Sequence, residues 1–327
     1  MENQNRVMWL VMAVGTALVV LGVIFSVLIG SIEIPIGTIW EAISGFDSEN
    51  SMHLLVVKMR LPRAVGGILV GMALAVAGAV MQGITGNPLA DSGILGISAG
   101  ATLALSLIIG FFPSIPYTSS LIIAFVGASV SAGVVYMISQ TADSAGLILS
   151  GACLSGLLTA LSQAFALSKG TTQSLAFWTL GSLGAIDASK LYIAFPVIIV
   201  SVLGAIRLSR QISAVSMGEE VAIGLGVKVN QTKQWAILLV VLLSGTAVAL
   251  AGMISFVGLM VPHVCRRLVG SSYKRIIPCS AVLGAVLMVY SDIGAKCLTA
   301  PAELPVGAVI AMIGAPMFLY VGRGAGA

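Results

Sequence analysis

Long apolar runs separated by short polar stretches dominate the chain between residues 7 and 322. A helix needs about 20 apolar residues to cross a bilayer, and it satisfies its own backbone hydrogen bonds there. The pattern predicts about ten spans, at residues 7–30, 63–83, 93–112, 117–139, 146–168, 189–206, 234–253, 254–270, 276–298 and 303–322. The stretch 235–265 is too long for one span, and Gly252, Gly258 and Pro262 are its candidate break points.

Composition agrees with a polytopic all-α membrane protein. Hydrophobic residues make up 58% of the chain and charged residues 9%, with a mean hydropathy of +1.09, whereas about a quarter of the residues in soluble domains are charged. The first run is too long for a signal peptide and has no small-x-small cleavage site, so we expect a retained helix. No linker or second domain is visible, which predicts one transmembrane domain over residues 1–327.

The distribution of lysine and arginine predicts the orientation. With ten crossings and an inner amino terminus, ten basic residues fall inside and six outside, which favours cytoplasmic termini. The inner set is Arg6, Arg207, Arg210, Lys228, Lys233, Arg266, Arg267, Lys274, Arg275 and Arg323, and the outer set is Lys58, Arg60, Arg63, Lys169, Lys190 and Lys296. The net charge of +4 reflects this bias and does not indicate a nucleic-acid partner.

A hydrophilic stretch at residues 207–233 interrupts the apolar runs on the predicted inner side. Ser216 and Glu219 have the spacing of a capping box, and Glu219 and Glu220 suit the positive end of a helix dipole. The glycines at 224 and 226 would end that helix. The stretch therefore predicts one short rigid helix that could receive a mechanical push from a partner, although an ordinary interfacial helix is the alternative.

Two similar segments suggest an inverted repeat. Residues 74–78 and 248–252 each end in glycine, and a proline follows ten residues later, at Pro88 and Pro262. By the crossing count the two segments run in opposite directions, as in many transporters, but chance similarity between Ala/Gly-rich helices is the alternative. Glycine pairs within the runs, such as Gly67 and Gly71, predict close helix packing, and Gly96 and Gly100 form a second pair.

Several chemistries find no support in the sequence. There is no Gly-x-x-x-x-Gly-Lys-Ser/Thr motif, so any ATP must be bound by a partner. Most acidic residues near the spans fall at their ends, which argues against an ion-gradient-driven carrier, and Asp292 is the ambiguous case. The four cysteines have no metal or disulfide spacing, and we expect them to pack. Ser98 lies in a Gly-x-Ser-x-Gly pattern, but an intramembrane serine hydrolase would need a strand-turn-helix elbow and a histidine partner.

Several motifs, in a fixed order from about residue 10 to 322, resemble the permease subunits of iron-siderophore, haem and vitamin B12 ABC importers. The matching segments are Arg60–Arg63, Gly78–Gln82, Asn87–Asp91, Leu95–Ala101, Gly218–Gly226, Phe256–His263 with Arg266, and Glu303–Gly307. The resemblance implies a BtuC-like fold with ten helices and an inverted repeat, in the inner membrane of a prokaryote. It implies no enzymatic activity and no cofactor in this chain, since ATP and Mg²⁺ would be bound by the ATPase partners.

The resemblance also implies partners and site residues. Two cytoplasmic ATPase subunits would dock on a coupling site comprising Ser216, Gly218, Glu219, Glu220, Ala222, Leu225 and Gly226. An extracytoplasmic binding protein would contact Arg60, Arg63 and Lys296, although snorkelling of the two arginines to lipid phosphates is an alternative. Gates would lie at Asn87 and Leu89, and at Ser144 and Ala145 in the loop before the fifth span, while Asn87-Pro88 could also be a plain helix stop. A second permease subunit would complete the pathway, with a ferric siderophore the first candidate cargo, ahead of haem and cobalamin.

Overall fold

The computed structural model describes residues 2–30, 34–112, 117–139, 144–299 and 302–324, and this part of the chain contains helices and no strands. Ten major helices lie where the sequence predicts spans: α1 (Glu2–Leu28), α4 (Leu61–Thr85), α5 (Ile97–Phe111), α6 (Tyr117–Ser139), α7 (Ser144–Lys169), α9 (Ala188–Val215), α11 (Val229–Ala251), α12 (Val257–Val269), α13 (Tyr273–Cys297) and α14 (Val306–Gly324). The short elements are α2 (Ile36–Ser44), α3 (Ser51–Leu54), π-helix η1 (Leu55–Arg60), 3₁₀ helix η2 (Ser92–Leu95), α8 (Thr172–Thr179) and α10 (Glu219–Gly224).

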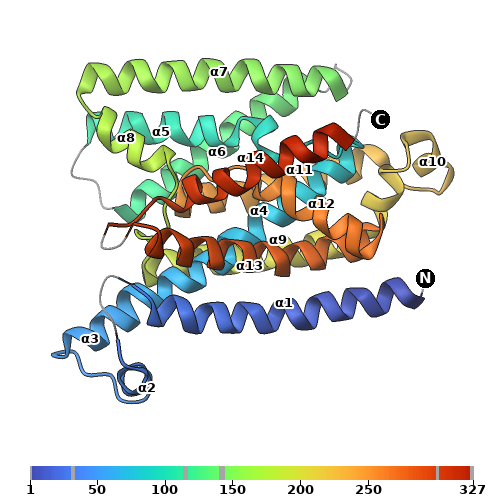
Figure 1. The fold of residues 1–327 in the computed structure, drawn as a ribbon. Helices are drawn as coiled ribbons and strands as arrows, with labels where there is room; N and C mark the ends of the chain where they lie inside the picture. Colours follow the sequence, from blue (N-terminus) through green and yellow to red (C-terminus); the bar gives the residue numbers. More distant parts are fainter. Residues whose placement is uncertain (1, 31–33, 113–116, 140–143, 300–301, 325–327) are drawn as a thin grey trace.

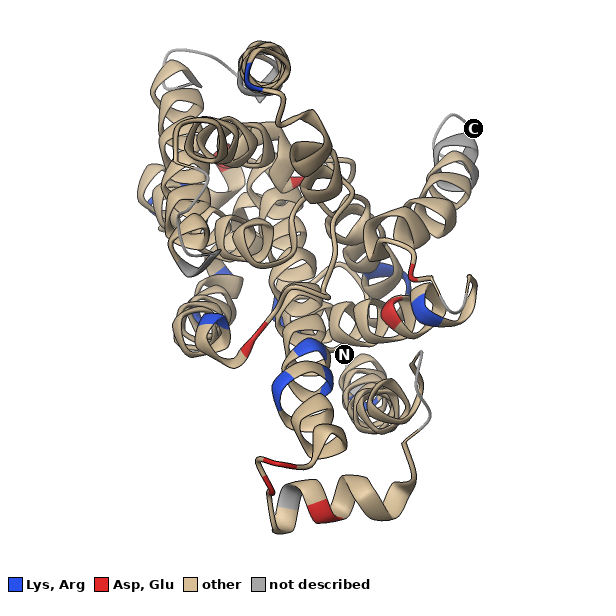
Figure 2. Cartoon of the chain, turned by 90° about the vertical axis from the view of Figure 1, so that its left-hand side faces the viewer, with Lys and Arg blue, Asp and Glu red and all other residues tan. Residues whose placement is uncertain are grey.

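Seven of the described helical segments are long and apolar enough to cross a membrane, and α5 and α14 contain shorter apolar helices. The helices run broadly along one direction, with α2 and α3 at one end and α10 and both termini at the other (Figure 1). Viewed from the α2 end, charged segments are few and most of the ribbon is uncharged (Figure 2). Of the predicted outer residues, Arg60 and Lys296 lie at the start of α4 and the end of α13, toward the α3 end, whereas the predicted inner residue Lys233 lies near the start of α11, next to α10.

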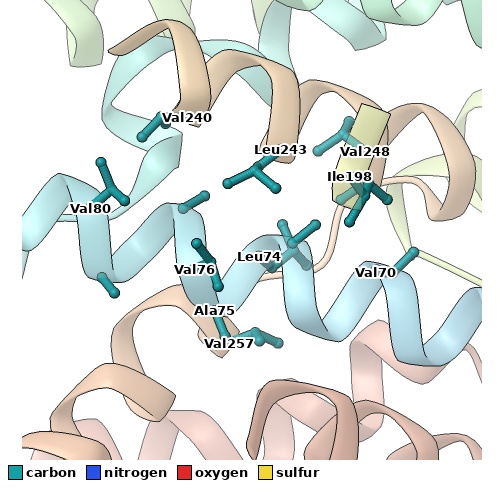
Figure 3. Close-up of a cluster of buried hydrophobic side chains, with 14 of the residues drawn as sticks. Val70, Leu74, Ala75, Val76, Val80, Ile198, Val240, Leu243, Val248 and Val257 are labelled. Atoms are coloured by element: carbon teal, nitrogen blue, oxygen red, sulfur yellow. The ribbon is translucent and has the colours of Figure 1, made fainter. Parts of the chain in front are cut away.

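Helix α4 forms the centre of the bundle. It continues α3 and η1 without a break. In an 18-residue apolar stretch of this continuous helical segment, 83% of the residues are buried. Its side chains Val70, Leu74, Val76 and Val80 pack in a cluster with residues of α9, α11 and α12 (Figure 3). A helix that is apolar on all sides can be buried in this way because its neighbours, rather than lipid, cover each face.

Small residues let the helices around α4 approach closely, as predicted. A Cβ atom added at Gly71 would overlap the carbonyl oxygen of Gly284 on α13. Farther along α4, a Cβ at Gly78 would overlap the backbone of Gly258 on α12. Backbone-to-backbone packing of this kind is typical of membrane bundles, where dispersion contacts replace the hydrophobic effect.

The division of the stretch 235–265 differs from part of the prediction. The chain leaves helical geometry at Gly252 and re-enters it at Val257, whereas Gly258 and Pro262 lie inside α12. Phe256, at the start of α12, has a φ of 69°, which is unusual for a bulky residue. Where α11 ends, the Ser182 N–H donates to the carbonyl of Ala251, its last residue, so a carbonyl left free at the helix end is satisfied by the loop before α9.

The two segments offered as an inverted repeat occupy different places in their helices. Gly78 lies in the interior of α4, and Pro88 follows in the turn beyond that helix. Gly252 instead caps α11, and Pro262 lies inside α12. These two pentapeptides therefore occupy different positions within their helices.

Helix α7 is the most weakly buried of the seven long spans. Only 17% of the residues in its 18-residue apolar stretch are buried, and the mean hydropathy of that stretch, 1.3, is the lowest of the seven. Thr159 and Gln163 are both exposed on it, beside leucines such as Leu157 and Leu161. A span that is both exposed and comparatively polar suits a subunit interface or an aqueous pathway better than lipid.

Candidate coupling, docking and gate sites

Helix α10 is a short, well-defined element between α9 and α11. Ala222 is fully buried and packs with Ala214, Val215 and Val229, which fixes the helix against its neighbours. At its end, Gly226 N–H donates to the Ile223 carbonyl and Val227 N–H to the Ala222 carbonyl. This pattern is a Schellman motif, and Gly226 supplies the left-handed residue with a φ of 78°. The predicted glycine stop is confirmed at Gly226, while Gly224 is the last helical residue.

The predicted capping box at Ser216 is wrong. Helix α9 extends to Val215, Ser216 is its C-cap, and the Ser216 hydroxyl donates to the Ser213 carbonyl. The N-cap of α10 is Gly218, with a φ of 117° and no side-chain hydrogen bond. The spacing matched because it measures only separation along the chain, whereas a capping box also requires an extended residue at the cap. Glu219 instead pairs with Lys233 at 2.5 Å.

The surface around α10 is unusually apolar for the end of a bundle. Met217, Val221, Ile223 and Leu225 are between 49% and 64% exposed. Gly218, Glu219, Glu220 and Gly226 are exposed beside them. We call residues 217–226 the coupling surface. A rigid helix that presents several adjacent uncovered apolar side chains at an aqueous boundary is typical of a protein-docking site.

A buried charge network lies at the opposite end, between α1, α4 and α13. The Asp292 carboxylate accepts from Arg63 Nε at 3.0 and 3.2 Å, pairs with Arg63 Nη2 at 2.9 Å, and pairs with Lys296 Nζ at 2.9 Å. Arg63 also contacts Glu303 at 2.6 Å, and Lys296 donates to Ser26 at its carbonyl and hydroxyl oxygens. The side chain of Asp292 is 2% exposed and that of Lys296 is 4% exposed. Asp292, the ambiguous acid of the sequence, is thus a buried counter-ion.

The three basic residues predicted to meet a binding protein are brought together here. Arg60, Arg63 and Lys296 line one cavity of about 200 Å³ with Glu303. They do not stand free on a rim, because Arg60 is only 7% exposed and its guanidinium donates to the carbonyls of Val27 and Leu28. The same geometry disfavours snorkelling to lipid phosphates. The partner of Arg63, Glu303, is 38% exposed. Arg63 is therefore the group best placed to leave Glu303 and pair with a carboxylate of another protein.

The predicted gate residues Asn87 and Leu89 lie in the turn after α4, where Asn87 Oδ1 accepts from Leu89 N–H at 2.9 Å. Left-handed Gly86 ends the helix, so the stop and the bend are one feature. Leu89 is 45% exposed and lines a small cavity with Phe256, His263 and Gly314. This meeting of the turn with α12 and α14 was not evident from the sequence, since the contacts are nonlocal.

The second predicted gate pair lies outside the part described in detail. The backbone places Ser144 and Ala145 in the first turn of α7 rather than in a preceding loop. Their side chains lie outside the described residues. Their assignment as gates therefore stays a prediction.

The serine of the hydrolase-like motif is in the first turn of α5. Gly96 is a left-handed residue between η2 and α5, and the Ser98 carbonyl accepts from the Thr102 hydroxyl. A nucleophile elbow requires a strand before the turn, and the described chain has none. Of the cysteines, Cys265 and Cys279 are buried as expected, whereas Cys153 and Cys297 are exposed, so the packing role holds for two of the four.

Comparison with known proteins points to one class of molecule. Residues 18–323 match the family model described as the FecCD transport family. The chain is 37% identical over 318 residues to the iron(3+)-hydroxamate import system permease protein FhuB of Bacillus subtilis, which covers 96% of this chain and 83% of that protein. It is 35% identical over 300 residues to the hemin transport system permease protein HmuU of Yersinia pestis, covering 89% of each. A solved metal-chelate type ABC transporter in an inward-facing conformation superposes with a TM-score of 0.85 at 29% identity, covering 96% of this chain and 98% of that one.

Proposed function

Because the chain belongs to the FecCD transport family, we propose that it carries a ferric siderophore through the bacterial membrane, with haem as the next candidate. The chain is the permease subunit of an ABC importer and a multi-pass membrane protein. Family membership decides against the ion-driven carrier and the serine hydrolase. The cargo is inferred from what the relatives are named for, iron-hydroxamate and hemin, which are both iron chelates.

The coupling surface is our proposed docking site for the motor. Importers of this class work with ATPase and binding-protein partners, and we infer two ATPase subunits that bind ATP and Mg²⁺ and dock at residues 217–226. Two features support this assignment. Ala222 anchors α10 rigidly to the bundle, and Leu225 and its neighbours leave apolar surface uncovered. A rigid helix can transmit a displacement that a flexible loop would absorb.

We infer that the binding protein docks at the other end, over the cavity lined by Arg60, Arg63 and Lys296. Acidic residues of that protein would compete with Glu303 for Arg63, because the Arg63–Glu303 contact is the more exposed part of the network. Charge contacts across an interface mainly set the encounter rate and the register of a complex. This arrangement requires the α10 end, with both termini, to face the cytoplasm.

A second permease subunit, either a copy or a paralogue, is proposed to face α7. The support is that only 17% of the apolar stretch of α7 is buried, while its mean hydropathy is the lowest among the long spans. Exposed Thr159 and Gln163 would line the pathway between the subunits, which needs weakly polar walls for a bulky chelate. The gate at Asn87 and Leu89 would close this pathway at the α10 end.

The test is co-purification and transport with the partner subunits. The complex is reconstituted in vesicles with its binding protein, and uptake of a radioiron-loaded hydroxamate siderophore is measured with and without ATP. Leu225→Glu should abolish ATPase co-elution and uptake, since Leu225 is 63% exposed and the change leaves the fold intact. Phe46→Glu, at an exposed aromatic of the opposite end, is the matched control and should retain the ATPase. Uptake that proceeds without ATP, or full coupling in Leu225→Glu, would contradict the proposal.

A further inference from the structure

A basic cleft lies between α9 and α13, near the α10 end of the bundle. It has a volume of about 540 Å³, within the range of small-molecule sites. Its lining residues are Ile206, Arg207, Ser209, Arg210, Gln211 and Lys274. Three of these six are cations and none is acidic, so the cleft carries a concentrated positive charge.

The three cations have no counter-ion within the described chain. The side chains of Arg207, Arg210 and Lys274 take part in no ion pair or hydrogen bond among the described residues. Some other basic residues of the described chain are paired with acids, as Lys233 is with Glu219 and Lys296 with Asp292. Like charges held together on two helices repel one another, and an anion in the cleft would relieve this repulsion.

An apolar stripe leads along α9 directly to the cleft. Val200, Leu203, Arg207 and Arg210 lie within a helical sector of roughly 80°, because their spacing is three, four and three residues. Val200 is 68% exposed and Leu203 is 60% exposed. The face thus changes from hydrocarbon-like to cationic within about two turns, as a phospholipid changes from chain to phosphate.

Helix α9, which carries the stripe, does not pack closely on α7, the helix assigned to contact with the second permease subunit. Helix α9 packs on α4, α10, α11 and α13, while its contacts include neither α7 nor α14 among the stronger helix pairs. Figure 1 also places α7 and α9 on different sides of the central helix α4. With the second subunit on the α7 side, the exposed face of α9 is left to lipid.

We propose that this cleft binds the phosphate head group of an anionic phospholipid, whose acyl chain lies along Val200 and Leu203. Basic clefts between helices at a membrane surface suit anionic head groups, and each cation near the surface adds to the attraction. Arg207 and Arg210 would hold the phosphate and Lys274 would close the cleft from α13. The site does not depend on which cargo the permease carries.

An acidic patch on an ATPase subunit is the competing occupant. The cleft lies on the flank of α9, one to two turns before that helix ends at Val215, and not on the coupling surface. A protein docked there would also have to cover the apolar stripe, which continues toward the membrane interior. Lipid satisfies both parts of the surface, so we favour lipid and test the protein as an outcome.

The experiment is native mass spectrometry of the intact complex with its ATPase subunits, titrated with dioleoyl phosphatidylglycerol or with dioleoyl phosphatidylcholine. Glycerol phosphate is the soluble probe without acyl chains. The variants are Arg207→Gln with Arg210→Gln, the charge-preserving Arg207→Lys with Arg210→Lys, and Lys274→Gln. Arg267→Gln is the matched control, because Arg267 is an exposed arginine at the same end that does not line the cleft.

The wild-type complex should prefer phosphatidylglycerol, and the double glutamine variant should weaken that binding roughly 30-fold, about fivefold for each cation. Lys274→Gln should cost about fivefold, while the lysine pair and Arg267→Gln should keep most of the affinity. Equal binding of the two lipids, an equal loss in Arg267→Gln, or equally tight binding of glycerol phosphate would overturn the proposal. Loss of the ATPase subunits with unchanged lipid binding would assign the cleft to the protein partner instead.

Discussion

Replacing Asp292 by asparagine tests whether the charge network is held together by one buried acid. The carboxylate is 2% exposed and is shared by Arg63 and Lys296. Asparagine keeps the shape but removes the charge, and its amide group would point a donor at one of the two cations. Arg60, also nearly buried, adds a third positive charge beside the cavity. Glu303 would be the remaining acid of the network.

The size of the expected loss of stability follows from the burial of the Asp292 side chain. Breaking a buried ion pair and leaving a cation uncompensated costs about 3–5 kcal/mol. Glu303→Gln removes a second partner of the same arginine, but the Glu303 side chain is 38% exposed, so the expected loss is below about 1 kcal/mol. The two substitutions are chemically matched and differ mainly in solvent exposure. The structure therefore predicts that Asp292→Asn lowers the free energy of unfolding several times more than Glu303→Gln does.

The assay is reversible unfolding in mixed micelles, followed by tryptophan fluorescence, from which the free energy of unfolding is extrapolated. Adding Lys296→Met to Asp292→Asn should recover part of the loss, because the unpaired ammonium is removed, and the two changes should be strongly non-additive. If Asp292→Asn were no less stable than Glu303→Gln, the network would not be a buried electrostatic unit and this reasoning would fail.

Three further predictions concern packing, capping and orientation. Gly71→Ala should lower the free energy of unfolding by about 1–3 kcal/mol, because the added Cβ would push α4 away from Gly284 on α13. Gly133→Ala, at a position with open space around it, should leave the free energy of unfolding unchanged, and unfolding measurements compare the two variants. Gly226→Ala should destabilise the end of α10 by about 1–2 kcal/mol and speed its proteolysis, while Gly224→Ala, in helical geometry, should not. If the α10 end is cytoplasmic, a membrane-impermeant maleimide should label exposed Cys297 from outside intact cells, and Cys297→Ser should abolish that labelling. Labelling only after lysis would show that the chain has the opposite orientation.

The positions of the ten major helices were predictable because each depends on a local property. An apolar run of sufficient length must form a helix in lipid, whatever its neighbours are. The division near Gly252 was harder, since three candidate breaks lay close together and Pro262 proved to be compatible with α12. The capping box at Ser216 failed because α9 extends to Val215, so Ser216 caps the end of α9 and does not begin the next helix.

The roles of charged residues needed the folded chain. Arg63 and Asp292 are 229 residues apart, and nothing in the local sequence of either one names the other as its partner. The predicted docking cations were correctly grouped at one end, but their burial changes what they can do there. Likewise, Leu89 meets Phe256 and Gly314 only because α4, α12 and α14 converge.

By itself, the sequence determined that this protein is an all-helical membrane protein, where its spans lie, and that a short helix lies in the polar stretch after α9. These properties depend on hydrophobicity, length and glycine stops, which act over a few turns of chain. Tertiary structure alone decided which charges are neutralised and which remain open. Arg63 and Lys296 close around Asp292 while Arg207, Arg210 and Lys274 gather without an acid, because burial and pairing depend on which helices pack together.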